Sequence, residues 1–148
     1  MRKIALAVLV LSAVTMASSR AAQSSSTLSV RGRSNAHVTM AVNGTFVAAV
    51  WSASLPAGVT DIFASVSRDN GATFSSPVRV NSIEGDARVN GEQPPRVTLV
   101  PVAGSAPQIA VVWTAKTPAG TALLTARSTD GGEAYYPVVQ TVQRDHVC

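Results

Sequence analysis

A pattern of eight residues occurs twice in this chain, at 67–74 and at 128–135, and both copies read Ser-x-Asp-x-Gly-x-x-aromatic. Each copy follows a matching stretch that contains a tryptophan: Val-Ala-Ala-Val-Trp-Ser at 47–52 and Ile-Ala-Val-Val-Trp-Thr at 109–114. A repeat with a period of about 60 residues restricts the architecture, because each copy must form the same structural unit. The sequence therefore predicts two similar units in tandem.

Apolar residues alternate with small or polar residues over short runs, and Gly, Pro and Asn separate these runs. This pattern is typical of strands and turns rather than of helices. Asn43-Gly44 predicts a two-residue hairpin turn with positive φ at both positions. The predicted strands, four in each unit, are 36–42, 45–52, 61–67 and 74–80, then 96–102, 108–115, 121–128 and 135–142.

The repeated segment lies between the third and fourth predicted strands, so it must turn the chain. Its aspartate is expected to accept hydrogen bonds from backbone N–H groups, and its glycine to adopt positive φ. The serine is expected to bond across the hairpin, and the aromatic residue to pack over the fourth strand. The residues at these positions are Ser67, Asp69, Gly71, Phe74, Ser128, Asp130, Gly132 and Tyr135.

This segment resembles the Asp-box, or BNR repeat, of the sialidase (neuraminidase) superfamily, and the surrounding pattern is similar to that of bacterial secreted sialidase-like proteins. The resemblance covers nearly all of the chain after the N-terminal segment. It implies an all-β fold, with two four-stranded antiparallel blades of a sialidase-like β-propeller after an N-terminal signal helix. Because propellers close with about four to eight blades, we expect an incomplete propeller and a partial member of a longer family. Packing between blades is the expected role of Trp51 and Trp113.

The resemblance implies that the Asp-box is structural and lies away from the ligand-binding side of the propeller. The other side would carry the loops between second and third strands and the link between blades. That link holds the densest charge in the chain, which is typical of a solvated loop with loosely paired charges; the alternative is that it forms part of a polar ligand face. The candidate residues of this face are Glu84, Asp86, Arg88, Glu92 and Arg96.

Sialidases as a family bind the substrate carboxylate with three arginines and use a tyrosine nucleophile paired with a glutamate, with an aspartate as acid/base. Arginine suits this task because its planar fork meets a carboxylate with two hydrogen bonds. The family motif that supplies the first arginine is absent, and Pro95-Arg96-Val97 is the nearest approach. We therefore assign no catalytic residue. Neither a cofactor nor a metal site is expected, because two isolated aspartates cannot supply the six to eight oxygens that calcium prefers.

The N-terminus has the layout of a signal peptide: a basic start, an apolar run at 4–14 and a small, polar stretch after it. The run is too short to cross about 30 Å of hydrocarbon, so export without a lasting membrane span is expected, to the periplasm or outside the cell. The predicted division is a signal peptide (1–22), a Ser-rich linker (23–34), blade 1 (35–80), an interblade loop (81–95), blade 2 (96–142) and a tail (143–148).

The formal charge of the whole chain is +4, from 12 basic and 8 acidic residues. Three of the basic residues, Arg2, Lys3 and Arg20, lie in the predicted signal peptide, so the rest of the chain is nearly neutral. Its basic residues are scattered, which argues against a nucleic-acid surface. Cys148 is the only cysteine, which excludes an intrachain disulfide and suggests a bond between chains.

Three functions remain open. The first is an exported propeller segment that is non-catalytic by itself and binds a glycan or another protein. The second is an exo-alpha-sialidase completed by missing blades or a partner chain. The third is a structural module that associates with itself through its open blade edges.

Overall fold

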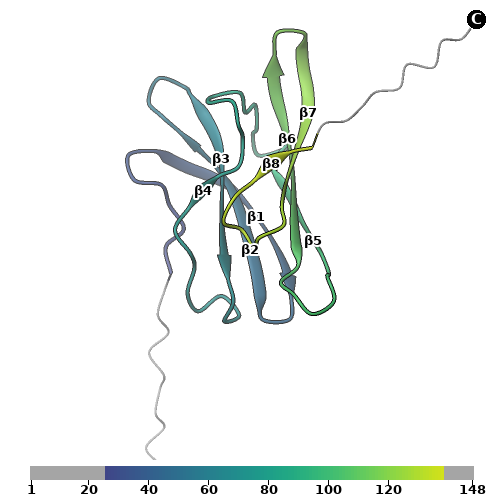
Figure 1. Ribbon diagram of the computed structural model, residues 1–148. Helices are drawn as coiled ribbons and strands as arrows, with labels where there is room; N and C mark the ends of the chain where they lie inside the picture. The colour runs from purple at the N-terminus through teal and green to yellow at the C-terminus, as the bar shows by residue number, and fades with distance from the viewer. Residues whose placement is uncertain (1–25, 139–148) are drawn as a thin grey trace, which may run out of the picture.

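The computed structural model describes residues 26–138 (Figure 1). The predicted signal peptide and tail, the start of the predicted linker and the end of the last predicted strand lie outside these residues. The described part is all-β and consists of two four-stranded antiparallel sheets, each with its strands in chain order. Within 26–138 no helix is long and apolar enough to cross a membrane.

The first sheet is formed by β1 (Ser34–Asn43), β2 (Phe46–Ser54), β3 (Thr60–Ser67) and β4 (Val78–Arg79). The second is formed by β5 (Arg96–Val100), β6 (Gln108–Thr117), β7 (Gly120–Ser128) and β8 (Tyr136–Pro137). In both sheets the first three strands start and end within two residues of their predicted bounds.

The fourth strand of the first sheet, β4, is shorter than predicted, whereas the end of the prediction 135–142 lies outside the described residues. In the first sheet, the Val66 N–H donates to the side-chain hydroxyl of Ser75 at 3.0 Å instead of to a backbone carbonyl. Pro77 follows and has no N–H to donate, so regular pairing begins only at β4. The first hairpin turn is also displaced by one residue: Asn43 pairs with Phe46, and only Gly44 has positive φ, at 58°. The turn is therefore Gly44-Thr45, and the prediction for Asn43-Gly44 was wrong.

The two sheets have the same internal register. Val47 pairs with Ser67 in the first sheet, and its sequence equivalent Ile109 pairs with Ser128 in the second. The equivalence extends along the strands, because every pair between β2 and β3 has a counterpart between β6 and β7. The predicted repeat is therefore confirmed as a repeat of structure.

A single hydrophobic core lies between the two sheets. The face that the second sheet turns toward this core is not the equivalent of the face that the first sheet turns toward it. The first sheet contributes Ala48 and Val50 of β2. The second contributes Ile109, Val111 and Trp113 of β6, whose sequence equivalents in β2 point to the other side of the first sheet. We call the two faces in contact the inner faces and the other two the outer faces. Strands β1 and β5 lie next to each other at this junction (Figure 1).

The two tryptophans therefore have different surroundings. Trp113 is 3% exposed and packs in the core between the sheets, as predicted. Trp51 is also buried, but it lies on the outer face of the first sheet, where its ring stacks on Phe63 at a centroid distance of 6.5 Å. Within the described residues no second sheet covers that face, so packing between blades stays a prediction for Trp51.

Candidate functional site

The connections between strands gather at two ends of the sheets (Figure 1). At one end are the two repeated loops and the β1–β2 turn. The first repeated loop is tied to this turn by a hydrogen bond from Asn70 N–H to Thr45 O at 2.9 Å. At the other end are the β2–β3 and β6–β7 loops and the link 81–95, where Arg88 N–H donates to Thr114 O at 2.7 Å. We call these the repeat end and the loop end. The predicted candidate ligand residues belong mainly to the loop end.

A buried polar cluster occupies the loop end of the first sheet. Asp61, at the start of β3, is fully buried and accepts hydrogen bonds from Gly85 N–H at 2.7 Å, Asn81 Nδ2 at 2.9 Å and Arg33 Nη1 at 2.7 Å. The Asn81 amide also donates to Asp86 Oδ1 at 2.9 Å, and its oxygen accepts from the Ile62 N–H. The cluster therefore ties β3 to the link and to the residues before β1.

The two carboxyl groups of this cluster have pKa shifts of opposite direction. Burial raises the pKa of Asp61, but the hydrogen bonds from Gly85, Asn81 and Arg33 outweigh it, so its pKa lies below the ordinary value. Burial raises the pKa of Asp86 and prevails, because its carboxylate has fewer donors and faces the charge of Asp61. The Trp113 indole lies close enough to lower this pKa, but it makes no hydrogen bond of standard geometry.

The structure separates the five predicted ligand residues. Asp86 is 6% exposed, so it is part of the buried cluster and not of a ligand face. Glu84 and Glu92 are exposed, and Glu84 lies 4.0 Å from Arg33. Their neighbours Arg88 and Arg96 are also exposed.

The exposed residues do not converge on one point. Arg88 donates to the backbone oxygens of Gly85 and Ala87. Arg96 pairs with Val112, which places its side chain on the outer face of the second sheet. The exposed charges of the link are thus spread over its surface and do not meet at one site.

Sequence reasoning missed Arg33, Asp61 and Asn81. Arg33 lies in the predicted linker 23–34, and Asn81 in the predicted interblade loop 81–95. One signal was available for Asp61, because a single carboxylate at the start of the apolar run Ile-Phe-Ala at 62–64 needs a partner when it is buried. That partner comes from a segment 28 positions earlier, which no local pattern identifies.

The two repeated loops share three hydrogen bonds: from the serine hydroxyl to the aspartate, from the glycine N–H to the serine, and from a backbone N–H four residues after the aspartate to its carboxylate. In the first, Ser67 Oγ donates to Asp69 Oδ1 at 2.7 Å and accepts from Gly71 N–H at 2.8 Å, and Asp69 Oδ1 accepts from Thr73 N–H at 2.9 Å. The glycine has a φ of 87°. The aspartate and glycine roles predicted for this loop are confirmed, but the serine bonds within the loop instead of across the hairpin.

The second loop repeats this arrangement. Ser128 Oγ donates to Asp130 Oδ1 at 2.7 Å and accepts from Gly132 N–H at 2.9 Å. The same carboxylate oxygen accepts from the N–H groups of Glu133 and Ala134 at 3.0 and 3.2 Å. Gly132 has a φ of 98°. Both aspartates are thus engaged in holding a turn.

The hydrogen bonds of the loops also determine their pKa values. The hydroxyls of Thr73 and Ser67 and the Thr73 N–H lower the pKa of Asp69 to about 2. The Ser128 hydroxyl has the same effect on Asp130 and lowers its pKa. Tyr135 packs against the core, its hydroxyl has no partner, and burial raises the pKa of that hydroxyl. A neutral, buried phenol of this kind is unsuited to act as a nucleophile.

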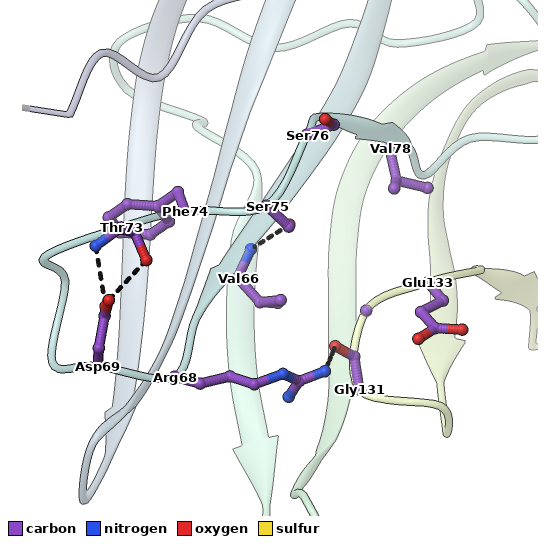
Figure 2. Close-up of a pocket in the computed structure, with 11 residues that line it drawn as sticks. Val66, Arg68, Asp69, Thr73, Phe74, Ser75, Ser76, Val78, Gly131 and Glu133 are labelled. Carbon is purple, nitrogen blue, oxygen red and sulfur yellow. Dashed lines mark hydrogen bonds between the residues drawn. The ribbon is translucent and has the colours of Figure 1, made fainter.

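A groove of about 620 Å³ lies between the two repeated loops (Figure 2). Figure 2 shows the Arg68 side chain reaching from the first loop to the second, where its Nη2 donates to Gly131 O at 3.3 Å. The same guanidinium lies over the Phe46 ring at 5.5 Å from its centroid. The groove is lined by Phe74, Val78 and Glu133 as well, but two of its charged members, Arg68 and Asp69, already have partners in the protein.

No group of three or more His, Cys, Asp or Glu side chains suited to a metal ion occurs in the described part of the chain. A scan against protein-family models finds no family that matches the sequence, and a search of curated proteins finds no relative.

Proposed function

We propose that this chain is an exported segment of a sialidase-like β-propeller, non-catalytic by itself, which acts by binding a glycan or another protein at its loop end. The propeller part of the proposal is supported by the matching repeated loops and by the packing of opposite faces of one unit. Export is proposed from the signal-peptide pattern of residues 1–22, outside the described part.

The proposal that the chain is non-catalytic by itself rests on the burial and hydrogen bonding of the carboxylates at the loop end. A glycosidase needs one carboxyl group that can exchange a proton with substrate and a nucleophile or base on the other side of the bond. Asp61 and Asp86 are buried and bonded to groups of the protein, so neither is available to a ligand. Tyr135 belongs to a repeated loop at the opposite end.

The arginines are not arranged to bind a substrate carboxylate either. Arg33 is bonded to Asp61, Arg88 to backbone oxygens, and Arg96 lies on the outer face of the second sheet. In sialidases three arginines meet the substrate carboxylate, and a guanidinium can form its two hydrogen bonds to a carboxylate only when the fork is free and directed at it. This supports a binding role that does not depend on the arginine triad of the family.

The loop end offers a surface suited to binding. Ile83 is 64% exposed, and the side chain of its neighbour Glu84 is 61% exposed. Arg88 and Glu92 are also exposed on the same link. An apolar side chain surrounded by charges of both signs is typical of small binding surfaces. The buried cluster fixes this link, so the surface is preorganised for a ligand.

Two-dimensional ¹H–¹⁵N spectra of the labelled chain, titrated with sialyllactose and with lactose, test the proposal. For a glycan ligand we expect saturating shifts in the link 81–95 and the β6–β7 loop, and weaker ones after Ile83→Asp or Arg88→Ala. Thr129→Ala, at the repeat end, is the control and should shift as the unmodified chain does. Absence of shifts with both sugars removes the glycan form of the proposal and leaves a protein ligand. Shifts confined to the repeat end would contradict the proposed surface.

A further inference from the structure

The outer face of the first sheet exposes three large apolar side chains on β1. Val38, Met40 and Val42 are 57%, 56% and 64% exposed. Met40 pairs with Ala49 and Val42 with Val47, so both lie on the same face as Trp51. A cavity of about 290 Å³ beside them is lined by Leu28, Asn35, His37, Val38, Met40 and Trp51, among others. This face is apolar and hollowed, which is typical of a surface that another element covers.

The repeat indicates what kind of surface covers such a face. The equivalents of Met40 and Val42 in the second sheet are Val97 and Leu99, which hold the same register against β6. Val97 and Leu99 belong to an inner face and pack against the core formed with the first sheet. The outer face of the first sheet is therefore built like the inner face of the second, but without its partner among the described residues.

The outer face of the second sheet shows the converse relation. Leu123 pairs with Thr114, and its equivalent in the first sheet is Ile62, which pairs with Ser52. Ile62 is fully buried in the core, whereas Leu123 is 70% exposed. At this position the outer face of the second sheet is built like the inner face of the first, but Arg127 and Thr125 stand where the first sheet has Val66 and Ala64.

We propose that a second copy of this chain packs the outer face of its second sheet on the outer face of the first sheet, head to tail. The contact would repeat the packing between the two sheets of one chain, with Leu123 of one copy in the position that Ile62 has within the chain. We choose a second copy as the partner because one chain carries both halves of the interface.

This contact buries the exposed apolar residues of both faces in one step. Arg96 and Arg127 also lie on the outer face of the second sheet, near the ends of β5 and β7. Their aliphatic stems can pack while the charged heads stay in water.

Head-to-tail interfaces form a ring when the rotation between copies closes. The number of copies rests on the proposed propeller function: about four to eight blades correspond to two to four chains. Each copy in a closed ring uses both outer faces. A variant with one damaged face can therefore still bind a copy whose other face is damaged.

Leu123→Arg and Val42→Arg test the proposal on the full chain, by sedimentation velocity with a reductant to exclude a bond through Cys148. Both side chains are exposed, so the fold should tolerate the changes, and near-UV circular dichroism checks this. We expect the unmodified chain to form an assembly of about two to four copies. Each variant alone should be monomeric, with a dissociation constant raised by at least about 100-fold, because a charge replaces a buried apolar group.

An equimolar mixture of the two variants should form a complex of two chains, since one copy supplies an intact first face and the other an intact second face. Val102→Arg, at an exposed apolar position outside both sheets and outside the proposed ligand surface, is the control and should assemble like the unmodified chain. A monomeric unmodified chain, assembly that survives Leu123→Arg, or a mixture that stays monomeric would each overturn the proposal. A monomer that still binds sugar at the loop end overturns this inference alone, whereas normal assembly without a loop-end ligand counts only against the proposed function.

Discussion

Replacement of Asp61 and of Asp86 by asparagine, one at a time, should have very different effects on stability. Asp61 is fully buried and accepts three hydrogen bonds of 2.7–2.9 Å, one of them from the guanidinium of Arg33. Asp61→Asn leaves that cation without its charge partner and turns an N–H group toward a site filled with donors. Loss of one partner of a buried ion pair costs about 3–5 kcal/mol, so we expect a decrease of that size in the free energy of unfolding.

Asp86→Asn is the matched control, because it removes a carboxylate from the same cluster. The hydrogen bond from Asn81 to Asp86 Oδ1 can be kept by an amide oxygen, and the cost of burying a second negative charge disappears. We therefore expect a change within about 1 kcal/mol at pH 7, or a gain in stability. Urea unfolding followed by the fluorescence of Trp51 and Trp113 measures both effects.

The pH dependence provides a second check on this pair. The folded-state pKa of Asp61 is lowered, so its stabilising contribution is complete above the unfolded-state pKa of about 3.9 and is lost as the pH falls through the folded-state value. Asp86 has the opposite sign, because its raised pKa means that protonation favours the folded state. Asp61→Asn should flatten the acid limb of the stability curve, and Asp86→Asn should not. Equal losses in the two variants would refute the assigned roles.

Three further predictions concern the repeated loops. Gly132→Ala should destabilise the chain more than Gly71→Ala, by roughly 1–3 kcal/mol in urea unfolding. Both glycines have positive φ, but only at Gly132 would an added Cβ lie 2.6 Å from Val66 Cγ1. Equal losses of stability would contradict the packing described. Ser128→Ala should cost about 1–3 kcal/mol and speed hydrogen exchange at Gly132, because the buried Gly132 N–H loses its acceptor, and unchanged exchange would contradict that bond. The carboxyl carbon of Asp69 should titrate by NMR with a pKa of about 2, and Thr73→Val should raise that pKa toward 3.8, whereas an ordinary value in the unmodified chain would exclude the loop hydrogen bonds.

The parts of the fold that depend on local sequence could be predicted. The strands follow from alternation of apolar and polar residues, and the loops at 67–74 and 128–135 from the short-range bonding of aspartate and glycine. The bulk of the strand pairing then follows, because consecutive strands are joined by short connections. The turn at Gly44 is displaced by one residue, so that Asn43 pairs with Phe46, and the turn sequence alone does not reveal this register.

The parts that depend on distant partners could not be predicted. The two tryptophans occupy equivalent positions, yet only Trp113 lies between the sheets, because the position of a neighbour decides which face is covered. Likewise, Asp86 lies among exposed residues of the link, but its carboxylate is buried against Asn81 and Trp113. The candidate ligand face thus lost the acidic residue that was most suggestive of chemistry, and the link is better described as a rigid surface.

Hydrolysis of a fluorogenic sialoside by the purified chain, followed at high protein concentration from pH 4 to pH 8, tests the central claim most directly. The account predicts no turnover above that of the buffer, and no difference between the unmodified chain and Arg96→Ala, because the carboxylates of the loop end are bonded within the protein and its arginines do not converge. Sustained turnover that disappears in Arg96→Ala would contradict the account and establish the chain as an enzyme.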